Sequence, residues 1–301
     1  MSRSSRILLF GQAGQVGWEL QRSLSVLGEV ISLDKNNTQY CGDLSRLQEL
    51  ANTVRNIQPD VIVNAAAYTA VDKAQSEPEL AHTVNALAPG VLAEEAQRIG
   101  AYLVHYSTDY VFNGIGHHAW KETDAPAPLN VYGQSKLEGE HRIMAACQKH
   151  LIFRTSWVYA ARGNNFAKTI LRLAKEREQL TIINDQIGSP TGADILADLT
   201  AHAIRQVIHF PRDTGLYHLA ASGETSWYGY AQFIVNHARH LGIQLKTTSE
   251  AITPVPSSSF QTQAIRPYNS RLDTAKLRAT FNLTLPNWQQ GVARMLDEIL
   301  F

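Results

Sequence analysis

Short apolar runs alternate with longer amphipathic stretches through the first half of the chain. The apolar runs are nearly continuous, which is typical of strands that are buried on both faces. They occupy residues 6–10, 29–33, 60–66, 101–107 and 150–156. The stretches between them carry apolar residues at helical spacing and end at Gly28, before Pro59 and at Gly100. Strict alternation of strand and helix predicts a parallel sheet with helices on both faces.

The alternation loosens after about residue 158. Helical spacing returns in "NNFAKTILRLAKERE", "GADILADLTAHAIRQVIH" and "LPNWQQGVARMLDEIL", and strand-like runs return in "LTII" and "GLYHLAAS". We therefore expect an α/β fold: a Rossmann-type doubly wound parallel sheet with a smaller, mainly helical lobe at the carboxyl-terminal side. The sheet domain should span residues 1–158 with roughly 190–220, and the lobe roughly 159–189 and 221–301.

Composition excludes several classes of protein. The 27 basic and 27 acidic residues cancel, so no basic excess points to nucleic acid. Two cysteines make no disulfide framework, which indicates a reducing compartment. The apolar run near the start is too short for a signal peptide, and no run reaches the roughly 18 residues of a membrane span. We expect a cytoplasmic protein that does not bind a membrane.

Three glycines follow the first predicted strand in "GQAGQVG". Gly11 would let the chain turn sharply, Gly14 would let a pyrophosphate approach the backbone, and Gly17 would let the next helix pack closely on the sheet. The free N–H groups of that helix start would face the phosphates. A P-loop is excluded, because no Gly-Lys-Ser/Thr follows. The strand–turn–helix context favours a dinucleotide site over a tight turn without a ligand.

Asp34 ends the second predicted strand, where a carboxylate can bind the adenosine ribose hydroxyls. It would repel a 2′-phosphate and so favours NAD(H), although the adjacent Lys35 could relieve that repulsion and leaves NADP(H) open. Further along, Asp43 and Leu44 are expected near the adenine. The small residues that end the third strand, Ala65, Ala66 and Ala67, would let a cofactor lie against the backbone.

The fourth predicted strand ends in "HYSTDYVF", and ligands bind at the carboxyl ends of strands in this architecture. Thr108 should therefore face the cleft, as should Asp109. Tyr132 and Lys136 lie four residues apart on the following helix and share a face. We expect His105, beside the strand end, to be structural rather than catalytic.

These residue types suit the reduction of a ketone. Negative charge develops on the oxygen as hydride adds, and a phenol such as Tyr132 can deliver the proton. An ammonium at Lys136 would lower the phenol's pKa, and Lys136 could also donate to the nicotinamide ribose. The Thr108 hydroxyl can hold the carbonyl oxygen. A Tyr–Lys pair alone occurs on many helix surfaces, so the prediction depends on the glycine turn and on Asp34.

Together the motifs resemble the extended short-chain dehydrogenase/reductase superfamily, and within it the dTDP-4-dehydrorhamnose reductases. The resemblance spans nearly the whole chain, in "VNAAAYTAVDKAQSEPE", "HYSTDYVFNG", "PLNVYGQSKLEGE", "NDQIGSPTGADILAD" and "RPYNSRLDTAKL". It implies reduction of the 4-keto group of a nucleotide sugar by NADH or NADPH. The product would serve bacterial surface polysaccharides, such as the O-antigen of lipopolysaccharide. The first five residues precede the family pattern and are expected to be a disordered extension.

The resemblance also implies roles for individual residues. Thr108, Tyr132 and Lys136 would be catalytic, Tyr132 and Lys136 also touching the cofactor. Cofactor contacts would come from Gly14, Gln15, Val16, Asp34, Asp43, Leu44, Ala67, Tyr68, Thr69 and Tyr106. Asp109 and Trp157 would contact the sugar with Thr108, with core packing as the alternative for Trp157. Arg266 would clamp the substrate pyrophosphate, with a surface salt bridge as the alternative.

The implied family is also associated with Mg²⁺. No carboxylate cluster in the sequence is typical of a dedicated magnesium site. Glu19 and Asp194 are the acidic residues to consider as metal ligands. They could lie at a contact between subunits, so a homodimer is left open.

Other functions within the same resemblance stay open. A nucleotide-sugar epimerase would retain and recycle its NAD. A dehydratase is disfavoured, because Tyr110 stands where the Thr-Asp-Glu pattern needs an acid. A non-catalytic regulatory subunit of the methionine adenosyltransferase type is disfavoured, because Thr108, Tyr132 and Lys136 are all present.

Overall fold

The computed structural model describes residues 5–301, and its centre is one sheet of six parallel strands. The strands are β1 (Ser5–Phe10), β2 (Gly28–Leu33), β3 (Val61–Asn64), β4 (Tyr102–Thr108), β5 (His150–Thr155) and β10 (Gly215–His218). Four residues of the expected N-terminal extension lie outside the described residues, whereas Ser5 pairs with Gly28 in the sheet. The predicted parallel α/β sheet is confirmed.

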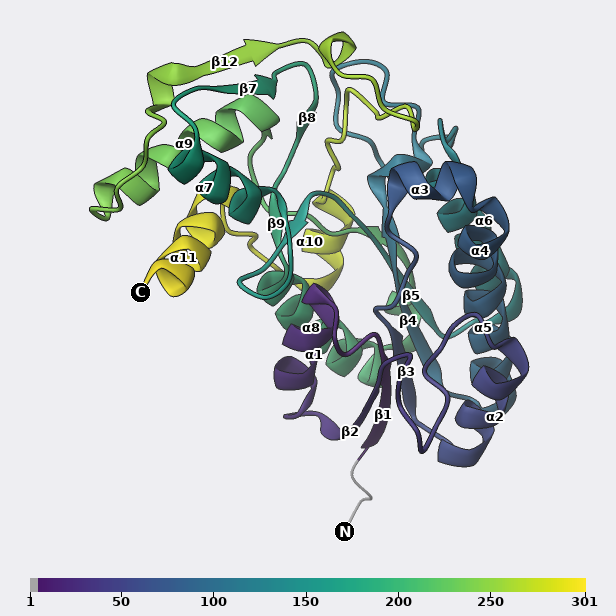
Figure 1. The fold of residues 1–301 in the computed structure, drawn as a ribbon. Helices are drawn as coiled ribbons and strands as arrows, with labels where there is room; N and C mark the ends of the chain where they lie inside the picture. Colours follow the sequence, from purple (N-terminus) through teal and green to yellow (C-terminus); the bar gives the residue numbers. More distant parts are fainter. Residues whose placement is uncertain (1–4) are drawn as a thin grey trace.

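Helices cover both faces of the sheet (Figure 1). One face carries α1 (Gln15–Leu24), α8 (Ala193–His209) and α10 (Ala275–Phe281), and the other carries α2 (Leu47–Ile57), α5 (Ala88–Ile99) and α6 (Val131–Ala146). Each helix turns one apolar stripe to the strands, because apolar residues recur at helical spacing. Helix α10 falls within the predicted lobe range, yet its Leu277 and Phe281 pack with α8 in the sheet core.

The connection from β3 to α5 is broken into short helices. These are α3 (Val71–Ser76), α4 (Pro78–His82) and a π-helical turn (Thr83–Leu87). The π-helical turn continues directly into α5, with no non-helical residue between them. Pro89 lies in the first turn of α5, directly after the π-helical turn.

The strand order is β10-β5-β4-β3-β1-β2, so the chain reverses its direction of winding between β1 and β3. In open α/β sheets, ligands bind at such a reversal, outside the carboxyl ends of the strands. The glycine turn follows β1 and the three alanines follow β3. The topology therefore brings both predicted cofactor segments to one crevice.

A separate apolar core holds the lobe, which lies toward the carboxyl ends of the strands (Figure 1). Its helices are α7 (Phe166–Glu176), α9 (Trp227–His240) and α11 (Trp288–Leu300), and its strands form two-stranded pairs. The strands are β6 (Val158–Tyr159), β7 (Leu180–Ile183), β8 (Ile187–Gly188), β9 (Thr191–Gly192), β11 (Thr225–Ser226) and β12 (Ile252–Val255). Short 3₁₀ turns occur at Asp109–Val111, Pro211–Asp213, Ser249–Ala251 and Ser257–Ser259.

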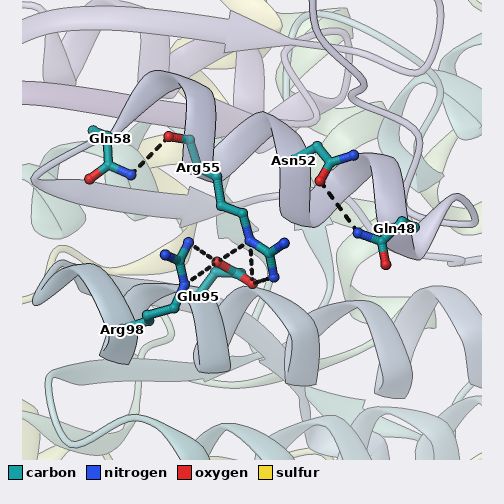
Figure 2. Close-up of polar contacts among 6 residues, drawn as sticks. All are labelled: Gln48, Asn52, Arg55, Gln58, Glu95 and Arg98. Atoms are coloured by element: carbon teal, nitrogen blue, oxygen red, sulfur yellow. Dashed lines mark hydrogen bonds and ion pairs between the residues drawn. The ribbon is translucent and has the colours of Figure 1, made fainter.

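A shared carboxylate ties α2 to α5 on the outer face of the sheet domain. Glu95 accepts from Arg55, with Nη2–Oε1 at 2.5 Å, and also from Arg98, as Figure 2 shows. Glu95 is buried, whereas both arginines are about half exposed. The arginines screen the buried charge from the apolar contact between the two helices, so that Glu95 can remain ionised.

Candidate active site

A cavity of about 710 Å³ opens at the carboxyl edge of the sheet, across the winding reversal. Every predicted cofactor residue except Gly17 lines it. The lining comprises Gly11, Gly14, Gln15, Val16, Asp34, Asp43, Leu44, Ala65, Ala66, Ala67, Tyr68, Thr69, Tyr106, Tyr132 and Lys136. Leu80, Val84, Thr155 and Val158 also line it and were missed by the sequence analysis, because they carry no motif.

The glycine turn leaves no room for side chains. Gly11 has φ +89°, and a Cβ there would lie 2.7 Å from the backbone nitrogen of Ala66. Gly17 lies beneath the turn, where a Cβ would be 2.0 Å from the Gly11 carbonyl oxygen. Gly14 precedes α1 and supplies no capping side chain, so the first N–H groups of α1 stay free for a ligand. The geometry suits a pyrophosphate against backbone N–H groups.

Asp34 is oriented by two neighbours at the edge of this cavity. Its Oδ2 accepts from the Gln12 side chain at 3.1 Å, and its Oδ1 accepts from the Asn36 N–H at 2.8 Å. Lys35 lines the same cavity. The opposite charges of Asp34 and Lys35 are compatible with an adenosine ribose with or without a 2′-phosphate. The geometry therefore does not choose between NAD(H) and NADP(H).

Thr108, Tyr132 and Lys136 come together where β4 meets α6. Burial raises the pKa of Tyr132 to about 12, with Asp109 adding to the shift and the Thr108 hydroxyl opposing it. Burial lowers the pKa of Lys136 to about 8, against the charge of Glu140. The Lys136 ammonium was expected to lower the phenol's pKa. In the structure Nζ contacts the Tyr106 carbonyl at 2.6 Å and His105 at 3.0 Å, and burial is the main cause of the raised pKa of Tyr132.

Asp109 lies below the site, almost fully buried. Its Oδ1 accepts from the Thr108 hydroxyl at 3.1 Å, and its Oδ2 has no hydrogen-bond partner within residues 5–301. Burial raises the pKa of Asp109 to about 7, with the neighbouring Ser270 and Thr108 side chains opposing the shift. The side chain therefore changes charge near neutral pH at the position predicted to contact the sugar.

Trp157 does not line the cavity at the carboxyl edge of the sheet. It adopts φ +49°, which is uncommon for a non-glycine residue, and its indole stacks on Trp227 with centroids 3.5 Å apart. Gly188 makes room for the ring, since a Cβ there would lie 2.7 Å from Trp157 Cε2. Of the two roles left open for Trp157, the structure shows packing between the end of β5 and α9.

A second cavity of about 600 Å³ lies against the lobe. Arg266 lines it and forms an ion pair with Asp72, with Nη2–Oδ2 at 2.6 Å. Tyr110 also lines it, and its ring lies edge-on to Tyr132 with centroids 5.6 Å apart. The two cavities therefore adjoin at these two aromatic rings. Most of the other lining residues, such as Trp227, lie at positions to which the sequence analysis assigned no function.

The predicted metal residues share a smaller pocket on the surface. Glu19 and Asp194 both line it, and each faces an arginine: Arg22 at 3.6 Å and Arg294 at 3.8 Å. Within residues 5–301, no group of three or more potential ligands is placed to hold a metal ion. In the same part of the chain, every helix is too short or too polar to cross a membrane.

A doubly wound sheet that sets a Tyr–Lys pair and a threonine hydroxyl beside a glycine turn is the architecture of the extended short-chain dehydrogenases/reductases. Comparison with known families makes the assignment specific. The sequence model described as "RmlD substrate binding domain" matches residues 5–301, and the chain belongs to this family.

The named relatives align with nearly the whole chain. The dTDP-4-dehydrorhamnose reductase of Escherichia coli K12 is 58% identical over 293 residues, which are 97% of each chain. The enzyme of the same name from Salmonella typhimurium is also 58% identical over 97% of each. A crystal structure of the Bacillus anthracis dTDP-4-dehydrorhamnose reductase, in complex with NADP, is 36% identical. It has a TM-score of 0.88 and covers 98% of this chain and 99% of that one.

Proposed function

We propose that the protein reduces the 4-keto group of dTDP-4-dehydro-L-rhamnose to give dTDP-L-rhamnose, with NADPH or NADH as reductant. The observation that carries the proposal is the junction of two cavities at Tyr132 and Tyr110. One cavity has the shape and the glycine turn of a dinucleotide site, and the other holds Arg266. The named relatives at 58% identity support the choice of sugar.

In this proposal the protein supplies the proton and the orientation. When bound, the reduced nicotinamide supplies the hydride. Tyr132 gives its phenolic proton to the carbonyl oxygen, and its raised pKa keeps that proton in place before the reaction. Thr108 holds the carbonyl oxygen beside the phenol. Lys136, buried in the first cavity, orients the cofactor ribose through its N–H groups.

The second cavity would take the nucleotide and its diphosphate. Arg266 has five N–H donors, and Asp72 uses one edge of the guanidinium while holding it in place. The remaining donors suit phosphate oxygens. Residues 1–158 with roughly 190–220 would then form the cofactor domain, and residues 159–189 with 221–301 the substrate lobe, apart from α10.

We also propose that Mg²⁺ and a second copy of the chain meet at Glu19 and Asp194. Glu298 lines the same pocket. A metal there would take its remaining ligands from water or from the second copy, because one described chain offers too few. Light scattering in Mg²⁺ and in EDTA tests this, and a monomer under both conditions contradicts it.

The enzyme assay follows oxidation of NADPH, and separately of NADH, after addition of dTDP-4-dehydro-L-rhamnose. Stoichiometric oxidation with appearance of dTDP-L-rhamnose is the expected result. A product formed without net oxidation would favour an epimerase that retains its cofactor. No turnover, together with capture of a stoichiometric enzyme partner, would favour a regulatory subunit. Cys41 and Cys147 are free thiols, which is consistent with the proposed reaction taking place in the reducing cytoplasm.

A further inference from the structure

A buried carboxyl lies directly beside the proposed catalytic hydroxyl. Asp109 begins the 3₁₀ turn after β4 and is only 3% exposed. Its Oδ1 lies 3.1 Å from the Thr108 hydroxyl oxygen, whereas its Oδ2 has no hydrogen-bond partner among residues 5–301. Ser270, whose N–H binds the Ile187 carbonyl of β8 at 2.8 Å, neighbours the carboxyl from the side of the lobe. The carboxyl is therefore enclosed between the end of β4 and a segment that the lobe holds in place.

The missing partner of Oδ2 favours a neutral carboxyl. A carboxylate carries charge on both oxygens, and burying either oxygen without a donor is costly. In the neutral acid, a proton on Oδ1 leaves Oδ2 as an uncharged carbonyl oxygen, for which a missing donor costs less. Burial accordingly raises the pKa of Asp109 to about 7, so both forms occur around neutral pH.

The form of Asp109 decides what the Thr108 hydroxyl can do. A hydroxyl has one donor and two acceptor sites, and the Tyr110 N–H occupies one acceptor site at 3.1 Å from Oγ1. If Asp109 is ionised, Thr108 donates to Oδ1 and has no proton left for a ligand. If Asp109 is neutral, its own proton binds the second acceptor site of Thr108. The Thr108 proton is then free to point at a carbonyl oxygen held beside Tyr132.

Two phenols face Asp109, one from each element beside it. Tyr132 faces it from α6 and Tyr110 from its own turn, and burial raises the pKa of both, to about 12 for Tyr132. The ion pair between Arg266 and Asp72 lies next to Tyr110, on the side of the second cavity. Both phenols keep their protons around neutral pH, so the carboxyl changes charge while its two aromatic neighbours do not.

We propose that Asp109 is a positioning residue that acts through Thr108: as a neutral acid it donates to the Thr108 hydroxyl, which then donates to the substrate carbonyl oxygen. The inference rests on the proposed reductase function. The carbonyl oxygen becomes negative as hydride adds, and it then meets two donors, Thr108 and Tyr132, instead of one. Tyr132 supplies the proton that the product keeps, and Asp109 keeps its own. Reduction should therefore slow as Asp109 becomes ionised.

The first test needs no substrate, so its failure is distinct from a failure of the proposed reaction. ¹³C NMR of cofactor-free protein labelled at the aspartate carboxyl carbons follows each carboxyl as the pH changes, and Asp109→Asn identifies the Asp109 signal by its loss. We expect Asp109 to titrate near pH 7, and at higher pH in Ser270→Ala, because the Ser270 side chain opposes the shift. A carboxyl that titrates near pH 4, like an exposed one, overturns the proposal.

The second test follows the rate of hydride transfer. Stopped-flow oxidation of bound NADPH should slow about tenfold between about pH 6 and pH 8, as Asp109 passes from mainly neutral to mainly ionised. In Ser270→Ala the fall should move to higher pH, and in Asp109→Asn it should vanish, because an amide does not titrate. Lys136, with a pKa of about 8, is the other group of the site that titrates close to this range. A fall that persists in Asp109→Asn would point to Lys136 and overturn the proposal.

A matched pair of variants tests whether Asp109 acts through the hydroxyl. Thr108→Val keeps the shape of the side chain and removes its hydroxyl, so the rate should be low at every pH and the fall between pH 6 and pH 8 should be lost. Thr108→Ser keeps the hydroxyl and should keep the fall. The ¹³C titration of Asp109 in each variant shows that the carboxyl still changes charge. A fall of full size in Thr108→Val would mean that Asp109 acts on the substrate directly, which contradicts the proposal.

Discussion

The two cavities that adjoin at Tyr132 and Tyr110 are lined by different kinds of segment. Most of the first is lined by residues that follow β1, β2 and β3, before the next helix begins, and by the last residues of β4. The second is lined by α7, β7, the start of α9 and the irregular segment 257–268. The repeated strand–turn–helix unit places the lining residues of the first cavity. The lining residues of the second cavity come together only because the lobe packs onto the sheet. We infer that substitutions in the second cavity can change which ligand it binds without affecting ligand binding in the first.

The largest effect on activity is expected at Tyr132, where the two cavities adjoin. Tyr132→Phe removes the proposed proton donor and should lower kcat by about 10²- to 10⁴-fold while leaving cofactor affinity unchanged. Stopped-flow turnover and NADPH titration measure the two quantities. Tyr102→Phe, which removes a hydroxyl bound to the Val207 carbonyl at the start of β4, is the control and should keep its activity. Wild-type turnover in Tyr132→Phe would exclude the mechanism.

A change in the second cavity should affect the sugar nucleotide alone. Arg266→Ala removes charged donors from that cavity and should raise KM for the sugar nucleotide roughly ten- to a hundredfold, with KM for NADPH unchanged. Steady-state kinetics with each substrate varied in turn separates the two. Arg271→Ala breaks a comparable ion pair, to Glu224, outside both cavities and serves as the control. Equal increases in both KM values would show that the cavities are not independent.

A change in the first cavity should have the converse effect. Asp34→Ala removes a negative charge where a 2′-phosphate would lie and should shift the ratio of kcat/KM toward NADPH on the order of tenfold. Asp34→Asn keeps the shape without the charge and should give a similar shift. An unchanged ratio in both variants would place the adenosine ribose elsewhere.

The smallest effect is expected far from both cavities. Glu95→Gln weakens the two ion pairs of Figure 2 and should lower the free energy of unfolding by about 1 kcal/mol, because both arginines are half exposed. The pairs, that to Arg55 first, lower the pKa of Glu95, so this contribution is present above its unfolded pKa and is lost as pH falls through the folded pKa. Urea unfolding measures it, with the exposed Glu94→Gln as the control. A loss of activity in Glu95→Gln would mean that this cluster also supports the site.

The same difference in construction explains how far the sequence could predict the structure. Apolar periodicity located the central strands, and the rule that ligands bind at the carboxyl ends of strands located the first cavity. Leu80 and Val84 were missed because the short helix α4 and the π-helical turn, on which they lie, leave no mark in the pattern. Most of the second cavity was missed for a further reason. Contacts between irregular segments depend on tertiary packing, and Arg266 was found only through a family resemblance.

His105 shows the limit of residue-by-residue prediction inside the well-predicted half. Its place on a buried strand suggested a structural side chain, and His105 lines neither of the two cavities. Its contacts with Asn64 and Lys136 depend on the strand register that sets Asn64 beside it and on the packing of α6 against β4. Neither relation can be read from the spacing of residues along the chain.

The stacked indoles of Trp157 and Trp227 also give the protein an internal optical probe. They link the segment after β5 to the first residue of α9, that is, the sheet domain to the lobe. Two parallel chromophores this close couple their electronic transitions, and the coupling falls steeply as they separate. The near-ultraviolet circular dichroism of the native chain should therefore contain a paired signal that neither single Trp→Phe variant retains. Its intensity would follow the docking of the lobe in solution, without any added label.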